Sequence, residues 1–338
     1  TLIVLPILVA NGFICGKMSG RGLGFTGGTL DKIQSVPNVD VNIDKQQFFE
    51  QIKCIGVALA GQTANLCPAD KKLYALRDVT ATVDNVGLIA ASIMSKKLAA
   101  GAHNIVLDVK CGKGAFMTDI VAATQLAELM VKIGKFAERN ISAIITDMNL
   151  PLSRFVGNSL EVLGAIRVLK NVEKGDLYDV AIALASQLMK SCGIDDAENK
   201  AKWAVDSGEA LKIFVKMMRA QGAVENFEMN EESLFDSKFC YNYVATQNGF
   251  VEDIDALKIA KIVAQLGGGR QKIDDVIDYK VGVEIVKTQS EQVENGDVVA
   301  KVFYSNEKQI DIAKTIVEAF RISSKNVKKA KRILKIVG

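Results

Sequence analysis

The sequence is poor in residue types that several classes of protein require. Its 338 residues include one histidine, one tryptophan and four prolines. The scarcity of proline argues against long disordered linkers. The histidine, His103, lies in AAGAHNIV between an expected helix end and an expected strand, with no catalytic partner beside it. A Ser-His-Asp triad is therefore excluded, and a capping or surface role is favoured for His103.

The six cysteines are scattered and form no CxxC pair. With a single histidine to share a metal, neither a zinc site nor a disulfide framework is expected, and free thiols in a reducing cytoplasm fit better. The net charge is +3, and basic residues alternate with acidic ones along most of the chain, so no nucleic-acid surface is indicated. The basic stretch 325–335 is interpreted as the solvated face of a terminal helix rather than as a polyanion site.

The apolar opening, TLIVLPILVANGFIC, has no basic segment before it and contains Pro6 and Asn11. It is interpreted as a buried helix and not as a signal or membrane segment. Because residue 1 is threonine, we expect the chain to begin inside a longer parent.

Two β-branched and nearly continuous apolar segments, 104–109 and 141–148, predict strands that are covered on both faces. Apolar residues at helical spacing lie between them, so a βαβ unit with a parallel pair of strands is predicted. A further strand is expected at 54–61, and helices are expected from about 160 to 222.

From about residue 236 the pattern becomes that of a separate α+β unit. A hairpin is expected around Asn248 and Gly249, followed by a helix that ends at glycines. The segments 282–288 and 297–305 then predict two strands on either side of a turn.

A glycine-rich stretch, MSGRGLGFTGGTLDK, follows the apolar opening at residues 18–32. Glycine lets backbone N–H groups approach an anion, and the stretch enters an expected helix N-terminus. Ser19 and Thr29 supply hydroxyl groups at its two ends, and Lys17 and Arg21 add positive charge. The pattern is neither a Walker loop nor a dinucleotide fingerprint, since no clear strand precedes it. From the residues alone, phosphate binding and a purely structural turn are equally supported.

A second group of residues lies on an expected helix that begins near Asn85. Ser92 and Lys96 are spaced i, i+4 and share a face with Ile89, while Arg77 lies just before the helix. These residues could bind a flat polar ring, but an amphipathic helix with its lysines in solvent is the simpler interpretation.

A third candidate is DVKCGKGAF at 108–116, which places Asp108 and Lys110 at the end of a strand. Ligands of α/β proteins usually bind at such a strand end. The glycines of this segment could equally do no more than turn the chain.

Several long blocks resemble the thymidine and pyrimidine-nucleoside phosphorylases, in the same order and at matching spacing. They are MSGRGLGFTGGTLDKI, GQTANLCPADKKLYALRDVTATVD, IMSKKLAAGA, IVLDVKCGKGAFM, ITDMNLPL with VGNSLEV, and GGGRQKIDDVIDYKVGV. The resemblance covers essentially the whole chain. It implies that a pyrimidine nucleoside and orthophosphate react to give the free base and an α-pentose 1-phosphate, with inversion at the anomeric carbon.

The resemblance also implies the site residues. Arg77, Ser92 and Lys96 match residues that hold the base, and Arg77 and Lys96 are expected to act in catalysis. Tyr74 and Ile89 match positions that line the same pocket. The positions that match phosphate-binding residues are Thr1, Lys17, Ser19 and Thr29. Because Lys17 stands where the broader enzymes of the family have lysine, activity on uridine, thymidine and deoxyuridine is expected.

The chain departs from the family's pattern in three places. The block KHSTGGVGDK would end directly before Thr1 and is absent, so we expect an N-terminally truncated chain with little phosphorolytic activity. Phe25 stands where relatives have a histidine. Gly164 stands where some relatives have a glutamate that helps to bind a potassium or calcium ion. We therefore expect no metal and no cofactor, with orthophosphate as a co-substrate.

The expected fold is an α/β body with a mixed sheet, the remnant of a small all-helical domain, and a C-terminal α+β domain. Residues 1–68 and 100–235 are expected to form the phosphate-binding body. Residues 69–99 would be the helical segment that carries the base site, and residues 236–338 the C-terminal domain.

The expected partners are a pyrimidine nucleoside and orthophosphate, with no nucleic acid and no membrane, and the parent is expected to be a cytoplasmic homodimer. One alternative is a catalytically incompetent fragment, or a nucleoside-binding or partner protein that lacks the phosphate loop. Another is a phosphoribosyltransferase of related architecture, which the set of Arg77, Ser92 and Lys96 disfavours.

Overall fold

The computed structural model describes residues 1–338 except 23–26, 62–66, 71–84, 271 and 273–274. The described residues form a mixed α/β structure with several sheets, which confirms the expected class at that level. The sheets have the strand orders β1-β2, β12-β4-β3, β5-β8-β10-β6 and β11-β7-β9. Among the described helices, none has both the length and the apolar character needed to cross a bilayer.

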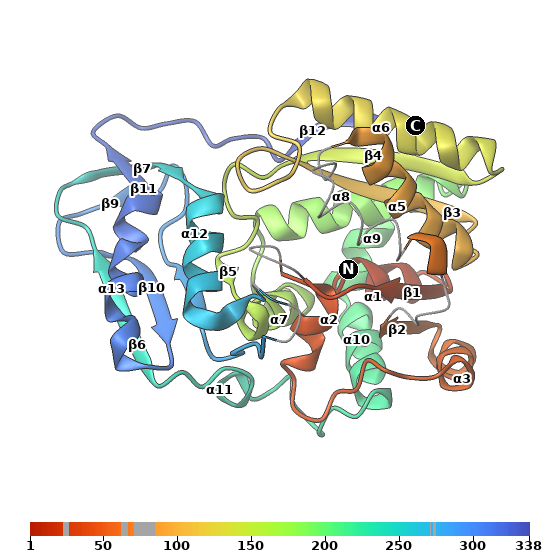
Figure 1. The fold of residues 1–338 in the computed structure, drawn as a ribbon, viewed down its shortest axis with the longest axis horizontal. Coiled ribbons are helices and arrows are strands. Elements are labelled where there is room, and N and C mark those ends of the chain that lie inside the picture. The colour runs from red at the N-terminus through yellow and green to blue at the C-terminus, as the bar shows by residue number, and fades with distance from the viewer. Residues whose placement is uncertain (23–26, 62–66, 71–84, 271, 273–274) are drawn as a thin grey trace.

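The predicted βαβ unit is confirmed. Strands β3 (Asn104–Cys111) and β4 (Asn140–Asp147) pair in parallel and are joined by helix α6 (Ile120–Phe136). The side chain of Asp119 caps this helix by accepting hydrogen bonds from the backbone N–H groups of Val121 and Ala122, each at 2.9 Å. Helix α6 covers one face of the pair, and α8 (Asp176–Ser191) covers the other (Figure 1).

The end of the chain adds a third strand to this sheet. Strand β12 (Ile333–Val337) pairs antiparallel with β4, so the interpretation of 325–335 as part of a helix is wrong. Basic residues precede the strand and Lys335 lies within it, but pairing with β4 satisfies its backbone, and this tertiary contact outweighs local helix propensity.

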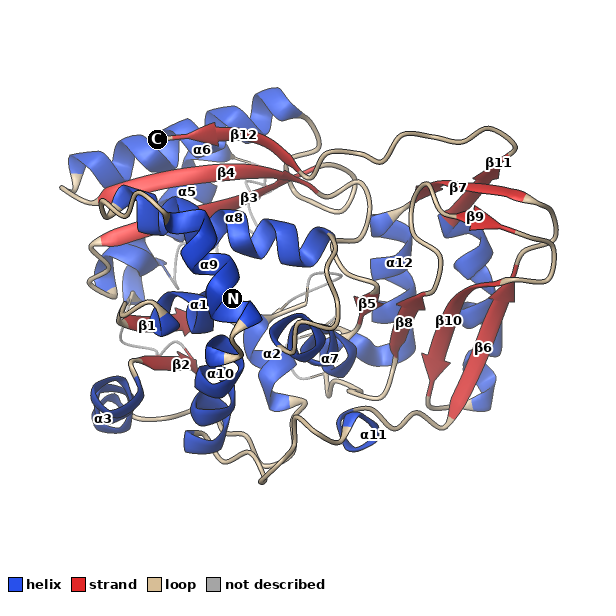
Figure 2. Ribbon diagram, turned by 180° about the vertical axis from the view of Figure 1, so that it is seen from behind, coloured by secondary structure: helices blue, strands red, loops and turns tan. Residues whose placement is uncertain are grey.

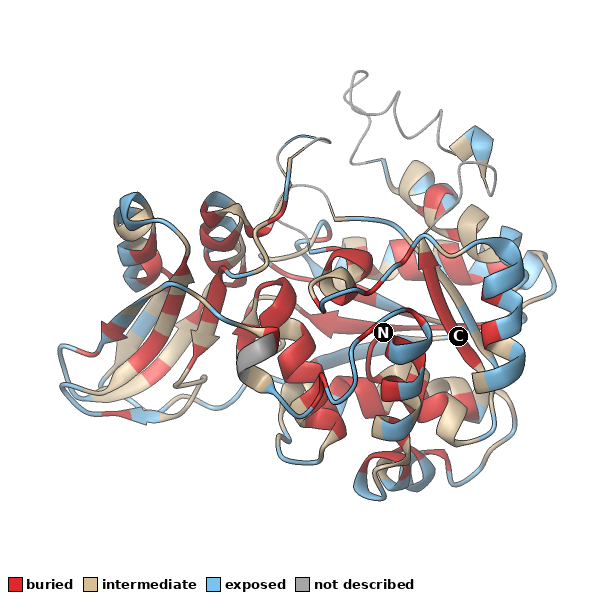
Figure 3. Ribbon diagram, turned by 90° about the horizontal axis from the view of Figure 1, so that it is seen from below, coloured by how far each residue is buried: buried red, intermediate tan, exposed pale blue. Residues whose placement is uncertain are grey.

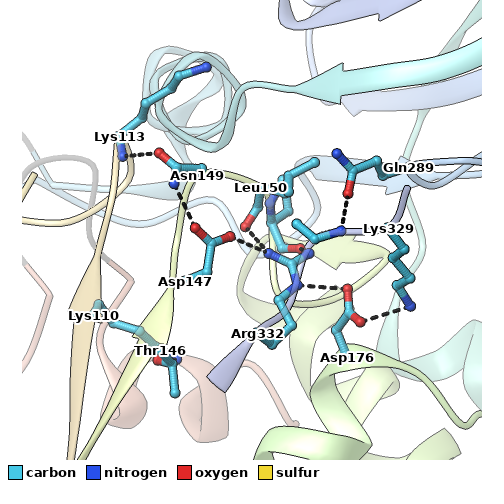
Figure 4. Close-up of polar contacts among 12 residues, drawn as sticks. Lys110, Lys113, Thr146, Asp147, Asn149, Leu150, Asp176, Gln289, Lys329 and Arg332 are labelled. Carbon is cyan, nitrogen blue, oxygen red and sulfur yellow. Dashed lines mark hydrogen bonds and ion pairs between the residues drawn. The ribbon is translucent and has the colours of Figure 1, made fainter. Parts of the chain in front are cut away.

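A buried arginine at the start of β12 fixes the strand to the body. The guanidinium of Arg332 forms ion pairs with Asp147 at 3.0 Å and Asp176 at 2.8 Å. It also donates to the backbone carbonyls of Leu150 and Pro151 at 3.1 and 2.8 Å (Figure 4). Its partners lie at the end of β4, in the segment that follows β4, and at the start of α8. One side chain therefore joins the start of β12 to these three parts of the chain.

The opening of the chain contains a helix and a strand, where one helix was predicted. Helix α1 (Val4–Ala10) is followed by β1 (Cys15–Ser19), which pairs in parallel with β2 (Val57–Gly61). The prediction that no strand precedes the glycine-rich stretch is therefore wrong. The strand expected from residue 54 begins only at Val57, because helix α3 (Lys45–Ile55) ends at Gly56 with a φ of 86°.

The predicted helical region is confirmed as a series of helices that pack on the body. They are α7 (Asn158–Leu169), α8, α9 (Ala197–Asp206) and α10 (Glu209–Ala220), with a short α11 (Glu231–Leu234) after them. Figure 3 shows their buried faces turned inward. Together with α1 they form the largest apolar cluster, which includes Phe214 and Met189.

The later part of the chain, here called the C-terminal unit, is built on two small sheets. Its elements are β6 (Phe239–Val244), β7 (Gly249–Ile254), α12 (Ala256–Val263), β8 (Gly282–Ile285), β9 (Gln292–Val293), β10 (Val298–Tyr304), α13 (Ile310–Lys314) and β11 (Phe320–Ser323). The hairpin predicted around Asn248 is wrong, because β6 pairs with β10 and β7 pairs with β9 and β11. The predicted strands β8 and β10 do pair with each other.

One strand from the body also enters the C-terminal unit. Strand β5 (Phe155–Val156), which directly precedes α7, pairs with β8. The helix predicted to end at glycines is α12, which continues as a turn of π-helix over Ala264–Gly268, with Gly267 at a φ of 101°.

Candidate functional site

The glycine-rich stretch connects β1 to α2 (Thr29–Gln34), with Gly28 at the helix N-cap. Residues 23–26, including Phe25, lie outside the described residues. The stretch has two described limbs, residues 18–22 and 27–32. They meet at Gly28, where an added Cβ would lie 2.1 Å from the backbone nitrogen of Gly22. Only glycine allows this approach, and the Asp31 carboxylate accepts a hydrogen bond from Gly22 N at 2.8 Å across the same contact.

Asp31, the one acidic residue in the sequence of this stretch, is deeply buried, with 1% of its side chain exposed. Arg21 contacts it from within the stretch at 3.2 Å, and Arg270 contacts it from the C-terminal unit at 2.7 Å. Two cations therefore balance the Asp31 carboxylate, because a buried charge is stable only when it is paired. The sequence reasoning did not single out Asp31 or Arg270, because 239 residues separate them along the chain.

The residues predicted to hold phosphate begin on β1. Lys17 lies on this strand, and its Nζ donates a hydrogen bond to the Thr1 hydroxyl. Burial is the largest cause that lowers the pKa of Lys17 to about 8; the positive charges of Lys97 and Lys32 act in the same direction, and the negative charge of Asp108 opposes them. Ser19 ends β1 and Thr29 begins α2, so the two predicted hydroxyls lie at the two ends of the stretch, half-buried.

The residues predicted to hold the base lie on helix α5 (Val86–Ala99), which Asn85 caps by accepting from Leu88 N at 3.0 Å. The face of α5 that includes Ala90 and Met94 packs on the core beside β3. Ile89 packs partly against this core. Tyr74 and Arg77 lie outside the described residues.

Ser92 and Lys96 lie together, as their spacing predicted. The Lys96 Nζ donates to the buried Ser92 hydroxyl at 3.2 Å and forms an ion pair with Asp70 at 3.0 Å. The simpler interpretation, in which these lysines extend into solvent, does not fit. Lys97 is half-buried, and burial together with the charge of Lys96 lowers its pKa.

Electrostatics link the two groups of predicted residues. Lys97 follows Lys96 on α5, and its charge is the largest electrostatic influence on the pKa of Lys17 after burial. The positive charges of the two ammonium groups therefore repel one another. Sequence reasoning had placed Lys97 in solvent, and no local signal distinguishes it from an exposed lysine.

The third candidate, at the end of β3, is a compact polar cluster. Lys110 forms an ion pair with Asp108 at 2.8 Å, and the Thr146 hydroxyl donates to Asp108 at 2.6 Å. The Lys110 Nζ also donates to Thr146 at 3.0 Å. Thr146 was missed from the sequence, although the parallel register places it directly opposite Lys110. The negative charge of Asp108 acts on Lys17, so this cluster borders the predicted phosphate residues.

Two further predictions concern His103 and a metal. His103 is exposed, and its backbone carbonyl accepts from Asn140 N at 3.0 Å. At Gly164, an added Cβ would lie 3.1 Å from Ser153 Oγ and 3.2 Å from Phe155, so a larger side chain would crowd this position. Within the described parts of the chain, no group of three or more His, Cys, Asp or Glu side chains could hold a metal ion.

Comparison with known proteins first defines the class. The family model described as "Glycosyl transferase family, a/b domain" matches residues 1–211, which include both groups of predicted site residues. The model of the "Pyrimidine nucleoside phosphorylase C-terminal domain" matches residues 250–323. The chain is therefore built on a glycosyltransferase-type α/β domain followed by this C-terminal domain.

The individual relatives narrow the class to one family. The chain is 43% identical over 315 residues to a pyrimidine-nucleoside phosphorylase of Staphylococcus epidermidis, covering 92% of this chain and 72% of the relative. It is 40% identical over 328 residues to that of Geobacillus stearothermophilus, covering 96% of this chain and 76% of the relative. The chain belongs to the pyrimidine-nucleoside phosphorylase family.

Among solved structures, an anthranilate phosphoribosyltransferase of Thermus thermophilus matches with a TM-score of 0.47 and 15% identity, covering 65% of this chain and 72% of that one.

Proposed function

We propose that this chain belongs to a pentosyltransferase that catalyses the phosphorolysis of pyrimidine nucleosides to the free base and an α-pentose 1-phosphate. The observation that carries the proposal is the pairing of Lys96 with Ser92 on α5, next to Lys97, whose charge reaches Lys17 on β1. In a chain of this family, that arrangement supports a base site on α5 and a phosphate site that begins on β1.

The chemistry requires positive charge at two places. As the glycosidic bond breaks, the sugar acquires oxocarbenium character and negative charge moves onto the departing pyrimidine. Lys96 supplies an ammonium group for that charge, with Ser92 and Ile89 beside it, and Arg77 and Tyr74 are proposed to complete the base site. A preorganised cation in this position stabilises the transition state more than the ground state, and so raises the rate.

Phosphate is the nucleophile in the proposed reaction. Lys17 would bind it as the ammonium ion, and the hydroxyls of Ser19, Thr29 and Thr1 would donate hydrogen bonds to its oxygens. Holding phosphate and nucleoside side by side converts a bimolecular attack into an effectively unimolecular one. We further propose that both uridine and thymidine are substrates, on the strength of lysine at position 17. A cytoplasmic location and a homodimeric parent are also proposed.

The replacement Lys96→Ala tests the assignment. We expect it to lower kcat/KM for uridine by about 10²–10³, the usual effect of removing one transition-state donor, while the far-UV circular dichroism stays that of the parent. Lys202→Ala is the matched control, because Lys202 forms an exposed pair with Glu198 at 2.6 Å away from the site.

Unchanged turnover in Lys96→Ala would reject the role given to Lys96. A parent chain that binds uridine but releases no free base in the presence of phosphate would reject the enzyme and favour a nucleoside-binding protein.

A further inference from the structure

The buried Asp31 is a point of contact between the glycine-rich stretch and the C-terminal unit. Its Oδ1 accepts from Arg270 at 2.7 Å, and its Oδ2 accepts from the backbone of Gly22 at 2.8 Å. The Asp31 carboxylate thus contacts the C-terminal unit through Oδ1 and the backbone of the stretch through Oδ2. Arg270 is itself largely buried, with 13% of its side chain exposed.

Arg270 is held in place by the body as well. It follows the glycine turn after α12, and the buried Asn158 of α7 donates to the carbonyl of Gly268 in that turn at 2.8 Å. Helix α7 also contacts α2 through an ion pair between Glu161 and Lys32. Helix α7 therefore joins the glycine turn to α2 through polar contacts between buried or half-buried groups.

We infer that Arg270 is a positioning residue for phosphate binding, which holds the Asp31 carboxylate and thereby sets the distance between the two limbs of the glycine-rich stretch. This inference rests on the proposed function. It goes beyond that function because it assigns part of the phosphate site to the C-terminal unit, through a residue that does not touch phosphate.

The physical reason is the burial of Asp31. Without Arg270, Asp31 would keep only Arg21, whose side chain is 40% exposed, and its Oδ1 would lose the shorter of its two ion pairs. The carboxylate would then turn towards solvent or draw in water, because an under-compensated charge is costly in a dry site. Either movement breaks the contact with Gly22 and separates Ser19 from Thr29, the proposed phosphate donors.

The test measures the binding of inorganic phosphate to the full chain by isothermal titration calorimetry, without nucleoside. We expect Arg270→Gln to weaken phosphate binding at least about tenfold, since displacements of about 1 Å in a positioned site have effects of that order. Arg270→Lys should recover part of the loss. Arg321→Gln is the matched control, because Arg321 pairs with Glu252 at 2.8 Å on an exposed face of the same unit.

A second pair of variants separates positioning from general loss of stability. Asp31→Asn removes the buried charge, so Arg270→Gln should have little further effect on phosphate binding when it is added to Asp31→Asn. The KM for uridine should change much less than the KM for phosphate in Arg270→Gln.

Three results would overturn the inference. They are wild-type phosphate affinity in Arg270→Gln, equal loss of affinity in the Arg321→Gln control, and equal changes in both KM values. A parent chain that binds no phosphate would overturn it as well. Phosphate binding that depends on Arg270 in a chain without phosphorolytic turnover would support the inference and refute the proposed function, so the two fail separately.

Discussion

The buried Arg332 offers the sharpest test of how the end of the chain is held. Replacing it with methionine keeps much of its length and apolar stem but removes both ion pairs and both hydrogen bonds to backbone carbonyls. Breaking a buried ion pair from one side costs about 3–5 kcal/mol. Asp147 keeps a hydrogen bond from Asn149 at 2.6 Å, and Asp176 keeps Lys329 at 2.8 Å, so the lower end, about 3 kcal/mol, is expected.

The assay is urea unfolding followed by far-UV circular dichroism. A loss of about 3 kcal/mol moves the midpoint down by about 1 M when the slope is about 3 kcal/mol per M. Lys335→Met is the matched control on the same strand, because Lys335 forms a half-exposed pair with Glu128 at 3.7 Å, for which about 0–1 kcal/mol is expected. If Arg332→Met shifts the midpoint no more than Lys335→Met does, the reasoning about β12 is refuted.

Two further predictions concern the phosphate side. Because the pKa of Lys17 is lowered to about 8, Lys17 is protonated below that pH, and phosphate affinity should fall as the pH rises through it. Lys17→Met should bind phosphate more weakly, and its phosphate affinity should no longer fall near that pH in titrations from pH 6.5 to 9.5. The matched control Lys53→Met, at an exposed position, should keep the fall. A fall that is retained in Lys17→Met would contradict the assignment. Gly28→Ala would place a Cβ 2.1 Å from Gly22 N, so a loss of about 1–3 kcal/mol in unfolding free energy and weaker phosphate binding are expected. Gly20→Ala, with open space around its Cβ, should change neither, and equal behaviour of the two variants would show that the close approach is unimportant.

Local pattern was sufficient for the elements whose periodicity is unambiguous. The buried strands β3 and β4 lie within two residues of their predicted bounds, and a helix forms between them, as the spacing of the apolar residues predicts. Their apolar residues repeat at the strand or helix period over their whole length, so nothing in the tertiary structure had to override the pattern.

The missed elements depend on contacts between distant parts of the chain. Strand β1 reads CGKMS, which has no apolar alternation, and it becomes a strand because β2 lies beside it. Strand β12 follows a basic stretch and is fixed by pairing with β4. The hairpin predicted around Asn248 failed for the same reason, since β6 and β7 each find another partner.

The candidate site likewise contains some residues that the sequence could bring together and others that it could not. Ser92 and Lys96 could be paired from the sequence because helix geometry alone puts them on one face. The contact of Arg270 with Asp31 spans 239 residues, and the effect of Lys97 on Lys17 joins a helix to a strand of another sheet. Such contacts follow from how the elements pack, so a single sequence carries no local signal for them.

The backbone passes between the body and the C-terminal unit four times: into β5, out of β5 to α7, before β6, and on the way to β12. A lobe attached by one covalent link can pivot freely, whereas four links restrain both rotation and translation. The links therefore hold the C-terminal unit against the body, which keeps Arg270 in place beside Asp31.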